Sequence, residues 1–307
     1  MAAAHHPPVV VVLGPTATGK SALGLILAER LDGEIVNADA LQVYRGLDIG
    51  TAKPTPEERA RVPHHLLDVA DPAERFSAGE FARRARAAVA DVRSWGRRPI
   101  VVGGSGLYLR ALLEGISPVP PGDPEVRRRL VGRLEEEGLP ALHDELARRD
   151  PATAARLPPG DTQRVLRALE VAEATGRPLS EWIARRPYGA ERLGAIRLGL
   201  TLPRALLYDA IARRVARMVE RGWVDEVERL LSGGLSPAAP AFQAIGYREI
   251  ARHVEGHWSL ERALEETVRA TRRYAKRQLT WFRKEPDILW LDSREVEREP
   301  ASAIKLC

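Results

Sequence analysis

The 307-residue sequence contains one cysteine, Cys307, which is also its last residue. A single cysteine forms no internal disulfide and no cysteine-rich zinc site, so a structural metal is not expected. Long apolar runs are missing as well, because no stretch of about eighteen apolar residues occurs. The segment "MAAAHHPP" has neither the positive start nor the apolar core of a signal peptide. We therefore expect a cytoplasmic protein without a membrane segment, and the sequence shows no sign of an obligate protein partner.

Lysine is scarce, although the formal net charge is +5. The five lysines are Lys20, Lys53, Lys276, Lys284 and Lys305, and the other basic residues are arginines. This scarcity gives weight to a lysine that falls inside a motif. The positive balance favours a polyanionic partner, although alone it also fits a solvated arginine-rich surface.

The stretch "VVVVLGPTATGKSA" begins with β-branched residues and then matches the pattern G-x-x-x-x-G-K-[ST]. This pattern forms a loop whose backbone N–H groups surround phosphates at the start of a helix. The predicted phosphate loop consists of Gly14, Pro15, Thr16, Ala17, Thr18, Gly19, Lys20 and Ser21. By motif alone such a loop is typical of nucleotide-binding and ATP-binding proteins.

Strands and helices alternate along the first part of the chain. Strands are predicted at 9–13, 33–39, 97–102 and 195–202, and helices at 21–31, 77–96 and 204–222. This order indicates a parallel sheet that binds ligands at the carboxyl ends of its strands. From the loop "SPVPPGDP" onward, residues 125–186 have a helical pattern without a strand. The predicted fold is a P-loop NTPase-like core, 9–117 with 195–307, and an inserted all-helical domain, 118–194.

Two further features lie at strand ends. Asp39 ends the second predicted strand, where a carboxylate serves as a magnesium ligand or a general base, or caps the next turn. The turn "GGSG", Gly103 to Gly106, places backbone N–H groups and the Ser105 hydroxyl at a helix start, which suits an anion but also fits an ordinary tight turn. Leu109 occupies the last glycine position of a dinucleotide-binding fingerprint, so that motif is not met.

The segment "TVRATRRYAKRQLTWFRK", 267–284, has seven basic residues and no acidic residue. Tyr274, Trp281 and Phe282 lie among these charges. Positive charges for phosphates beside flat rings for stacking are typical of a surface that binds single-stranded or loop RNA. The alternative is a helix whose aromatic residues pack in the core and whose arginines are only solvated.

Seven motifs in order closely resemble those of the bacterial tRNA dimethylallyltransferase family, also called tRNA isopentenyltransferase. They are "GPTATGKS", "NADALQVYRGLDIGTAKP", "HHLLDV", "GGSGLYLRALLEG", "QRVLRALEV", "AIGYRE" and "KRQLTWFRK". The resemblance runs from Gly14 to Lys284. It implies transfer of a dimethylallyl group from dimethylallyl diphosphate to N6 of the adenosine just 3′ of the tRNA anticodon, position 37, within the anticodon loop.

The resemblance also implies roles for individual residues. Asp39 is implied as the base that accepts the N6 proton, Ser105 and Arg214 as contacts of the diphosphate, and Lys20 and Ser21 as ligands of the diphosphate and its Mg²⁺. Arg213 is the alternative to Arg214 in this alignment. Implied tRNA contacts are Asp39, Ala40, Leu41, Gln42, Arg127, Gln163, Arg164, Arg167, Gln243, Gly246, Tyr247, Arg248, Lys276, Arg277, Gln278, Trp281 and Arg283. Many members have threonine in place of Ser105, and serine keeps the hydroxyl without the methyl group that restricts its rotamer.

Other functions remain possible on the residues alone. A small-molecule P-loop kinase would use the same loop with ATP, but it leaves the basic segment 267–284 unexplained. A nucleotide-switched RNA-binding protein would use both features without needing Asp39. An adenylate isopentenyltransferase acting on free nucleotide would not need the RNA-contacting segments.

Overall fold

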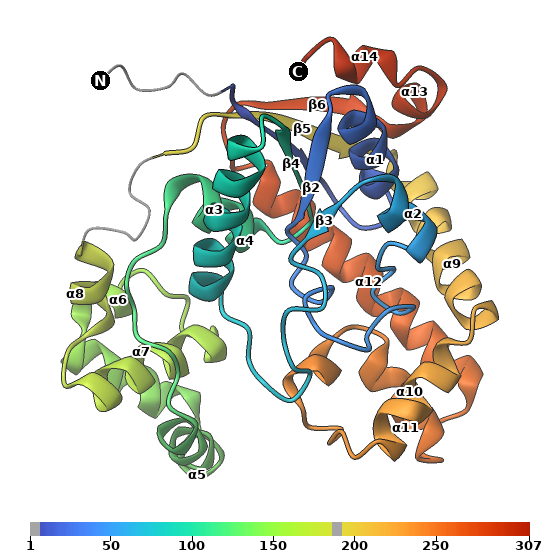
Figure 1. Ribbon diagram of the computed structural model, residues 1–307. Helices are drawn as coiled ribbons and strands as arrows, with labels where there is room; N and C mark the ends of the chain where they lie inside the picture. The colour runs from blue at the N-terminus through green and yellow to red at the C-terminus, as the bar shows by residue number, and fades with distance from the viewer. Residues whose placement is uncertain (1–6, 186–191) are drawn as a thin grey trace, which may run out of the picture. The chain divides into compact units, whose positions relative to one another are not determined.

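The computed structural model describes residues 7–185 and 192–307, which form two compact units (Figure 1). The first unit joins the chain up to Leu113 with Leu193–Cys307, and the second comprises Glu114–Arg192. Both divisions lie a few residues before the expected domain boundaries at 117 and 194. Among the described residues, no helix is long and apolar enough to cross a membrane.

The first unit is built on a six-stranded parallel sheet of order β3-β2-β4-β1-β5-β6. Its strands are β1 (Val9–Leu13), β2 (Gly33–Asn37), β3 (His64–His65), β4 (Arg98–Val102), β5 (Ala195–Thr201) and β6 (Ile288–Asp292). The central strand β1 pairs with β4 on one side and β5 on the other. This arrangement confirms the predicted α/β fold class. The edge strands β3 and β6 were not predicted.

Every side chain of β1 is buried, which is why β-branched residues fill this strand. Val9, Val11 and Leu13 face a core shared with α3 (Ala78–Ser94) and α4 (Gly106–Glu114). Val10 and Val12 face the opposite core, against α1 (Lys20–Arg30). The sheet is thus packed on both faces, and its strand ends are left to form the site.

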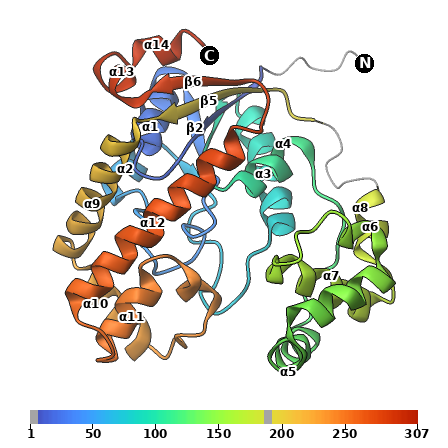
Figure 2. The same ribbon diagram turned by 180° about the vertical axis from the view of Figure 1, so that it is seen from behind.

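The remaining helices of the first unit surround these layers. They are α2 (Pro56–Arg61), α9 (Arg204–Glu220), α10 (Trp223–Ser232), the 3-10 helix η1 (Pro240–Gln243), α11 (Tyr247–Val254), α12 (Leu260–Phe282), α13 (Ser293–Arg298) and α14 (Ala301–Ile304). Figure 2 shows α12 running from the sheet to α10 and α11. Around the buried Trp223, Phe242 and Tyr247, a separate hydrophobic core joins α10, η1 and α11.

The second unit is helical throughout its described residues. It contains α5 (Pro124–Arg149), α6 (Pro151–Ala154), α7 (Thr162–Thr175) and α8 (Leu179–Ala184). Asp123 caps α5, which is interrupted at Gly138 because that residue has a non-helical φ of 79°. Leu130, Leu142 and Leu169 lie in its hydrophobic core.

Candidate active site

The loop between β1 and α1 adopts a conformation that depends on its glycines. Gly14 and Gly19 have φ values of 137° and 81°, and a Cβ atom on Gly14 would overlap the Leu200 carbonyl. Lys20 Nζ and Thr18 Oγ1 both donate to the Pro15 carbonyl, at 2.7 and 2.9 Å. The first turn of α1 has no acidic residue and no side-chain cap, so its N–H groups are available to an anion.

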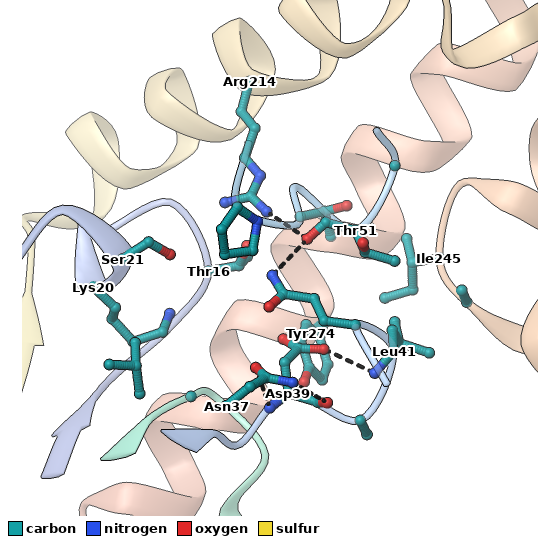
Figure 3. A pocket seen from close by; sticks show the side chains of 18 of the residues that line it. Thr16, Lys20, Ser21, Asn37, Asp39, Leu41, Thr51, Arg214, Ile245 and Tyr274 are labelled. Carbon is teal, nitrogen blue, oxygen red and sulfur yellow. Dashed lines mark hydrogen bonds between the residues drawn. The ribbon is translucent and has the colours of Figure 1, made fainter. Parts of the chain in front are cut away.

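This loop borders a cavity of about 390 Å³ in the first unit (Figure 3). Lys20 and Ser21 line one wall, and Asp39, Arg214 and Tyr274 line others. One strand end and helices α1, α9 and α12 therefore contribute polar side chains to a single space. The cavity is the place where the separate sequence motifs meet.

Asp39 lies just beyond β2, and its backbone position is fixed by Asn37. Asn37 Oδ1 accepts from Asp39 N–H at 3.1 Å, and Asn37 Nδ2 donates to the Leu66 carbonyl at 3.1 Å. Asp39 Oδ1 accepts from Leu41 N–H at 2.9 Å, so the carboxylate does cap the following turn. This cap employs one oxygen of a carboxylate that lines the cavity, and it is compatible with a second role in proton transfer.

Two positive side chains face this carboxylate across the cavity. Burial and the nearby Arg214 guanidinium lower the pKa of Lys20 to about 7, while Asp39 acts in the opposite direction. Burial also lowers the pKa of Arg214, and Asp39 opposes that change. Arg213, the alternative to Arg214, is exposed and does not line this cavity. The structure therefore places Arg214, not Arg213, in the cavity with Lys20 and Asp39, whereas Arg213 lines a separate pocket on another side of the phosphate loop.

Ser105 lies in the turn that follows β4. A Cβ atom on Gly103 would overlap the Ala38 carbonyl, so the turn requires glycine to approach the end of β2. Ser105 Oγ accepts from Ala40 N–H at 3.1 Å, and this bond orients the hydroxyl without the methyl group of threonine. Burial raises the pKa of Tyr274, the Asp39 carboxylate adds to this, and a hydrogen bond with Ser105 opposes it.

A buried carboxylate that no sequence motif marks, Glu226, shapes the loop beside Arg214. Glu226 accepts from the N–H groups of Asp48 and Ile49 at 3.0 and 2.8 Å, and from Tyr247 Oη at 2.5 Å. Farther along this loop, the Thr51 carbonyl accepts from Gln42 Nε2 at 3.1 Å and from Arg214 Nη2 at 3.5 Å. No local sequence pattern reveals this role, because the partners are about 175 residues apart.

Tyr247 requires a correction, because it was expected to contact tRNA. Its side chain is fully buried and its hydroxyl is bound to Glu226, so it offers no surface to RNA. Gly246, in the same motif, is buried against Trp223. Gln243 and Arg248 of this motif are exposed.

Helix α12 divides its side chains between two faces. The exposed face carries the basic residues Arg269, Arg273, Lys276 and Arg277, and the exposed Arg283 follows directly after the helix. The opposite face packs inward, and both amide atoms of Gln278 are hydrogen-bonded inside the protein. The helix therefore presents a row of exposed positive charges, whereas Gln278, expected to contact RNA, uses both amide atoms for internal hydrogen bonds and lines the cavity.

Of the three aromatic residues in this segment, Tyr274 lines the cavity, whereas Trp281 and Phe282 do not form an exposed stacking surface. Phe282 is 1% exposed in the core beneath the sheet. Trp281 is half-buried, and the Arg110 guanidinium covers its ring at 4.8 Å from the centroid. For these two rings, the core interpretation replaces the expected stacking on bases.

In the second unit, the expected RNA-contacting residues lie on two neighbouring helices. Gln163 and Arg164 are exposed on α7. Arg127 on α5 donates to Gln163 Oε1 at 2.9 Å, and Arg167 donates to the Pro120 carbonyl. These arginines also form ion pairs with Asp161 and Glu170, so the side chains make a polar patch of mixed charge on this unit.

The phosphate loop offers few protein ligands for a magnesium ion. No cluster of three or more histidine, cysteine or carboxylate side chains suited to a metal occurs among the described residues. The hard oxygen that the loop offers is the exposed Ser21 hydroxyl, which lines the cavity. A single protein ligand fits Mg²⁺, because this ion keeps several waters and is held largely by phosphate oxygens.

Comparison with known proteins shows which family this sequence matches. The sequence model of the IPP transferase family matches residues 42–285. The chain is 50% identical over 289 residues to a tRNA dimethylallyltransferase of Syntrophobacter fumaroxidans, covering 94% of this chain and 84% of that protein. It is 51% identical over 283 residues to a tRNA dimethylallyltransferase of Geobacter metallireducens, covering 92% of each.

Two solved structures are also similar to this chain. The full-length tRNA isopentenylpyrophosphate transferase of Bacillus halodurans is 39% identical with a TM-score of 0.68, over 98% of this chain and 97% of that one. A eukaryotic dimethylallyltransferase acting on tRNA is 29% identical with a TM-score of 0.79, over 96% of this chain and 77% of that one.

Proposed function

This chain belongs to the IPP transferase family, and on that premise we propose that it transfers a dimethylallyl group from dimethylallyl diphosphate to tRNA. The acceptor is N6 of the adenosine that lies 3′ of the anticodon, at position 37, and diphosphate is released. The observation that supports this proposal best is the meeting of Asp39 with Lys20 and Arg214 around one cavity.

The acceptor needs a base because the lone pair of an adenine amino group is delocalised into the ring. As N6 forms its bond to the allylic carbon, the nitrogen becomes positively charged and must lose a proton. Two carboxylates line the cavity, and we assign the proton transfer to Asp39, because Glu58 is engaged with Thr55 at the start of α2. Asn37 and Leu41 hold Asp39 in place, so little reorganisation is needed during the reaction.

The donor needs stabilisation of its leaving group because negative charge grows on the diphosphate as the carbon–oxygen bond breaks. Lys20, Arg214 and the N–H groups at the start of α1 supply positive charge and hydrogen-bond donors in a partly buried site. The Ser105 hydroxyl is the neutral donor for the bridging oxygen. The Ser21 hydroxyl would hold a magnesium ion at this loop, and the ion would supply further positive charge to the diphosphate.

The RNA needs a surface outside the cavity, because the target base must leave the anticodon loop to reach the donor. The exposed charges of α12 are suited to the phosphates of that loop. Arg277 lies on α12 and also lines the cavity, so this helix connects the charged surface to the reaction space. We assign Gln163, Arg164 and Arg127 of the second unit to tRNA as well.

The test is incubation of the protein with labelled dimethylallyl diphosphate, magnesium and an unmodified tRNA transcript with adenosine at position 37. Nucleoside analysis should detect N6-dimethylallyladenosine, and a matched transcript with guanosine at position 37 should remain unlabelled. Labelling of free adenylate in preference to tRNA would instead indicate an adenylate isopentenyltransferase. Consumption of ATP with a small-molecule acceptor would indicate a kinase.

A further inference from the structure

Gln278 joins the phosphate loop to the glycine turn after β4. Its side chain is 6% exposed, on the inward face of α12. Gln278 Oε1 accepts from Thr16 N–H at 2.9 Å, and Gln278 Nε2 donates to the Gly104 carbonyl at 2.9 Å. One amide therefore binds two loops that lie 262 and 174 residues away from it in the sequence.

The glycine turn after β4 approaches α12 more closely than an ordinary residue allows. A Cβ atom on Gly104 would overlap Gln278 Nε2, and its next neighbour would be the Gly14 carbonyl at 3.4 Å. A Cβ atom on Gly106 would overlap the Trp281 ring, one turn farther along α12. Glycine is therefore needed at both positions, because Gln278 and Trp281 of α12 occupy the space that a side chain would fill.

The amide also meets a specific chemical need. Thr16 N–H is a backbone donor and the Gly104 carbonyl is a backbone acceptor, and leaving either without a partner in a buried place is costly. A primary amide satisfies both at once, whereas a carboxylate or an apolar side chain of the same length does not.

We propose that Gln278 is a positioning residue that holds the phosphate loop and the Ser105 turn at the separation needed by the diphosphate. This inference rests on the proposed function, because the ligand it concerns is the diphosphate of the prenyl donor. Gln278 also lines the cavity, but both of its amide atoms are engaged by the two backbones, so it acts through the positions of those loops. It makes α12 a helix with two roles, since its exposed charges face RNA while its inward amide orders the donor site.

The test compares Gln278→Met with Thr280→Ala. Methionine keeps the length and approximate volume of glutamine but forms neither hydrogen bond. Thr280 is the matched control because it is exposed on the same helix and its hydroxyl donates to the Lys276 carbonyl of that helix. Thermal unfolding of each variant identifies the folded protein, and calorimetry then measures binding of inorganic pyrophosphate with magnesium.

Gln278→Met should weaken pyrophosphate binding and raise the KM for the donor by about 5- to 30-fold. Its affinity for tRNA should stay within about twofold of the unchanged protein, and Thr280→Ala should alter neither ligand. A merely structural role would leave the pyrophosphate affinity of the folded variant unchanged or weaken both ligands alike, and either result overturns the inference.

A second variant separates hydrogen bonding from packing. Gly104→Ala should weaken pyrophosphate binding because its methyl group displaces the Gln278 amide. The double variant Gly104→Ala with Gln278→Ala has room for that methyl group but lacks both bonds, so it should remain weak. Recovery of normal pyrophosphate affinity in the double variant would show that Gln278 only fills space. Pyrophosphate binding needs no prenyl transfer, so failure of the proposed function would be seen separately, as absence of product with the unchanged protein.

Discussion

At the scale of single residues, the reaction depends on charged side chains that lie close to one another around the cavity. Lys20, Asp39 and Arg214 influence each other electrostatically, and burial lowers the pKa of both cations. An anionic donor would relieve the repulsion between the two cations. The site is therefore suited to bind a ligand with at least two negative charges.

Replacing Asp39 by Asn tests the assignment of the base. The amide keeps an oxygen that accepts from Leu41 N–H, so the turn should survive, but it no longer accepts a proton. The rate of prenyl transfer should fall by roughly 10² to 10⁴, with tRNA affinity nearly unchanged. Single-turnover kinetics and filter binding measure the two quantities. Near-normal turnover would exclude Asp39 as the base.

Lys20 predicts a pH dependence of donor binding. With a pKa of about 7 in the free protein, the amine is largely neutral at pH 8, and the bound diphosphate should raise this pKa. Binding should therefore take up as much as about one proton per donor above pH 7, and donor affinity should fall as pH rises beyond that value. Calorimetry in buffers of different ionisation enthalpy measures the uptake.

The control for this proton uptake is Lys20→Arg, because a guanidinium remains charged at pH 8. Any titration of the diphosphate itself occurs in both proteins and cancels in the comparison. Equal proton uptake by the two proteins would contradict the assignment to Lys20.

Residue types predicted much of this site, while distant contacts determined the rest. Gly14, Gly19, Lys20 and Ser21 form a local motif whose geometry follows from closely spaced positions. Asp39 and Ser105 were found because they follow predicted strands. Glu226 and the role of Gln278 were missed, because each depends on partners more than 170 residues away. Only the folded chain brings such groups together.

At the scale of elements, α12 shows how one helix combines two environments. Its apolar and amide side chains recur at spacings of three and four residues and face inward, while its basic residues occupy the other face. The charge pattern in the sequence correctly predicted an exposed basic face on this helix. Trp281 and Phe282 were misread as a surface for bases, because a ring in a basic segment has the same sequence signature in the core.

Phe282→Ala should lower the free energy of unfolding by about 3–5 kcal/mol, because it empties a fully packed position beneath the sheet. Lys284→Ala, two residues later and exposed, is the control and should change stability little. Urea denaturation measures both. A small loss of stability in Phe282→Ala would restore the ring as a candidate RNA contact.

Replacing Arg273 and Lys276 together by Ala should weaken tRNA binding and reduce its salt dependence. The slope of log K against log salt should change by about 0.7 to 0.9 for each phosphate that is no longer bound. Pyrophosphate binding should be unaffected, because both side chains are exposed and neither lines the cavity. Arg298→Ala, on α13, is a charge control. An unchanged salt slope would make α12 purely structural.

At the scale of the whole molecule, the fold combines a parallel sheet, whose strand ends contribute to the site, with helices that surround it. The alternation of strands and helices predicted the parallel sheet, and the helical pattern from residue 125 onward predicted the second unit. The edge strands escaped prediction for different reasons. β3 has only two residues, and β6 is a partly exposed strand whose pairing with β5 depends on residues about 90 positions earlier.

The central claim is that the phosphate loop holds a diphosphate leaving group and that no nucleotide is consumed. The measurement is a reaction with labelled dimethylallyl diphosphate, unmodified tRNA and magnesium in nucleotide-free buffer, with prenyl incorporation and diphosphate release followed together. The account predicts one diphosphate released for each group transferred, competition by inorganic pyrophosphate, and loss of turnover in Lys20→Ala. A requirement for ATP, or phosphate release from ATP at the rate of tRNA modification, would contradict it.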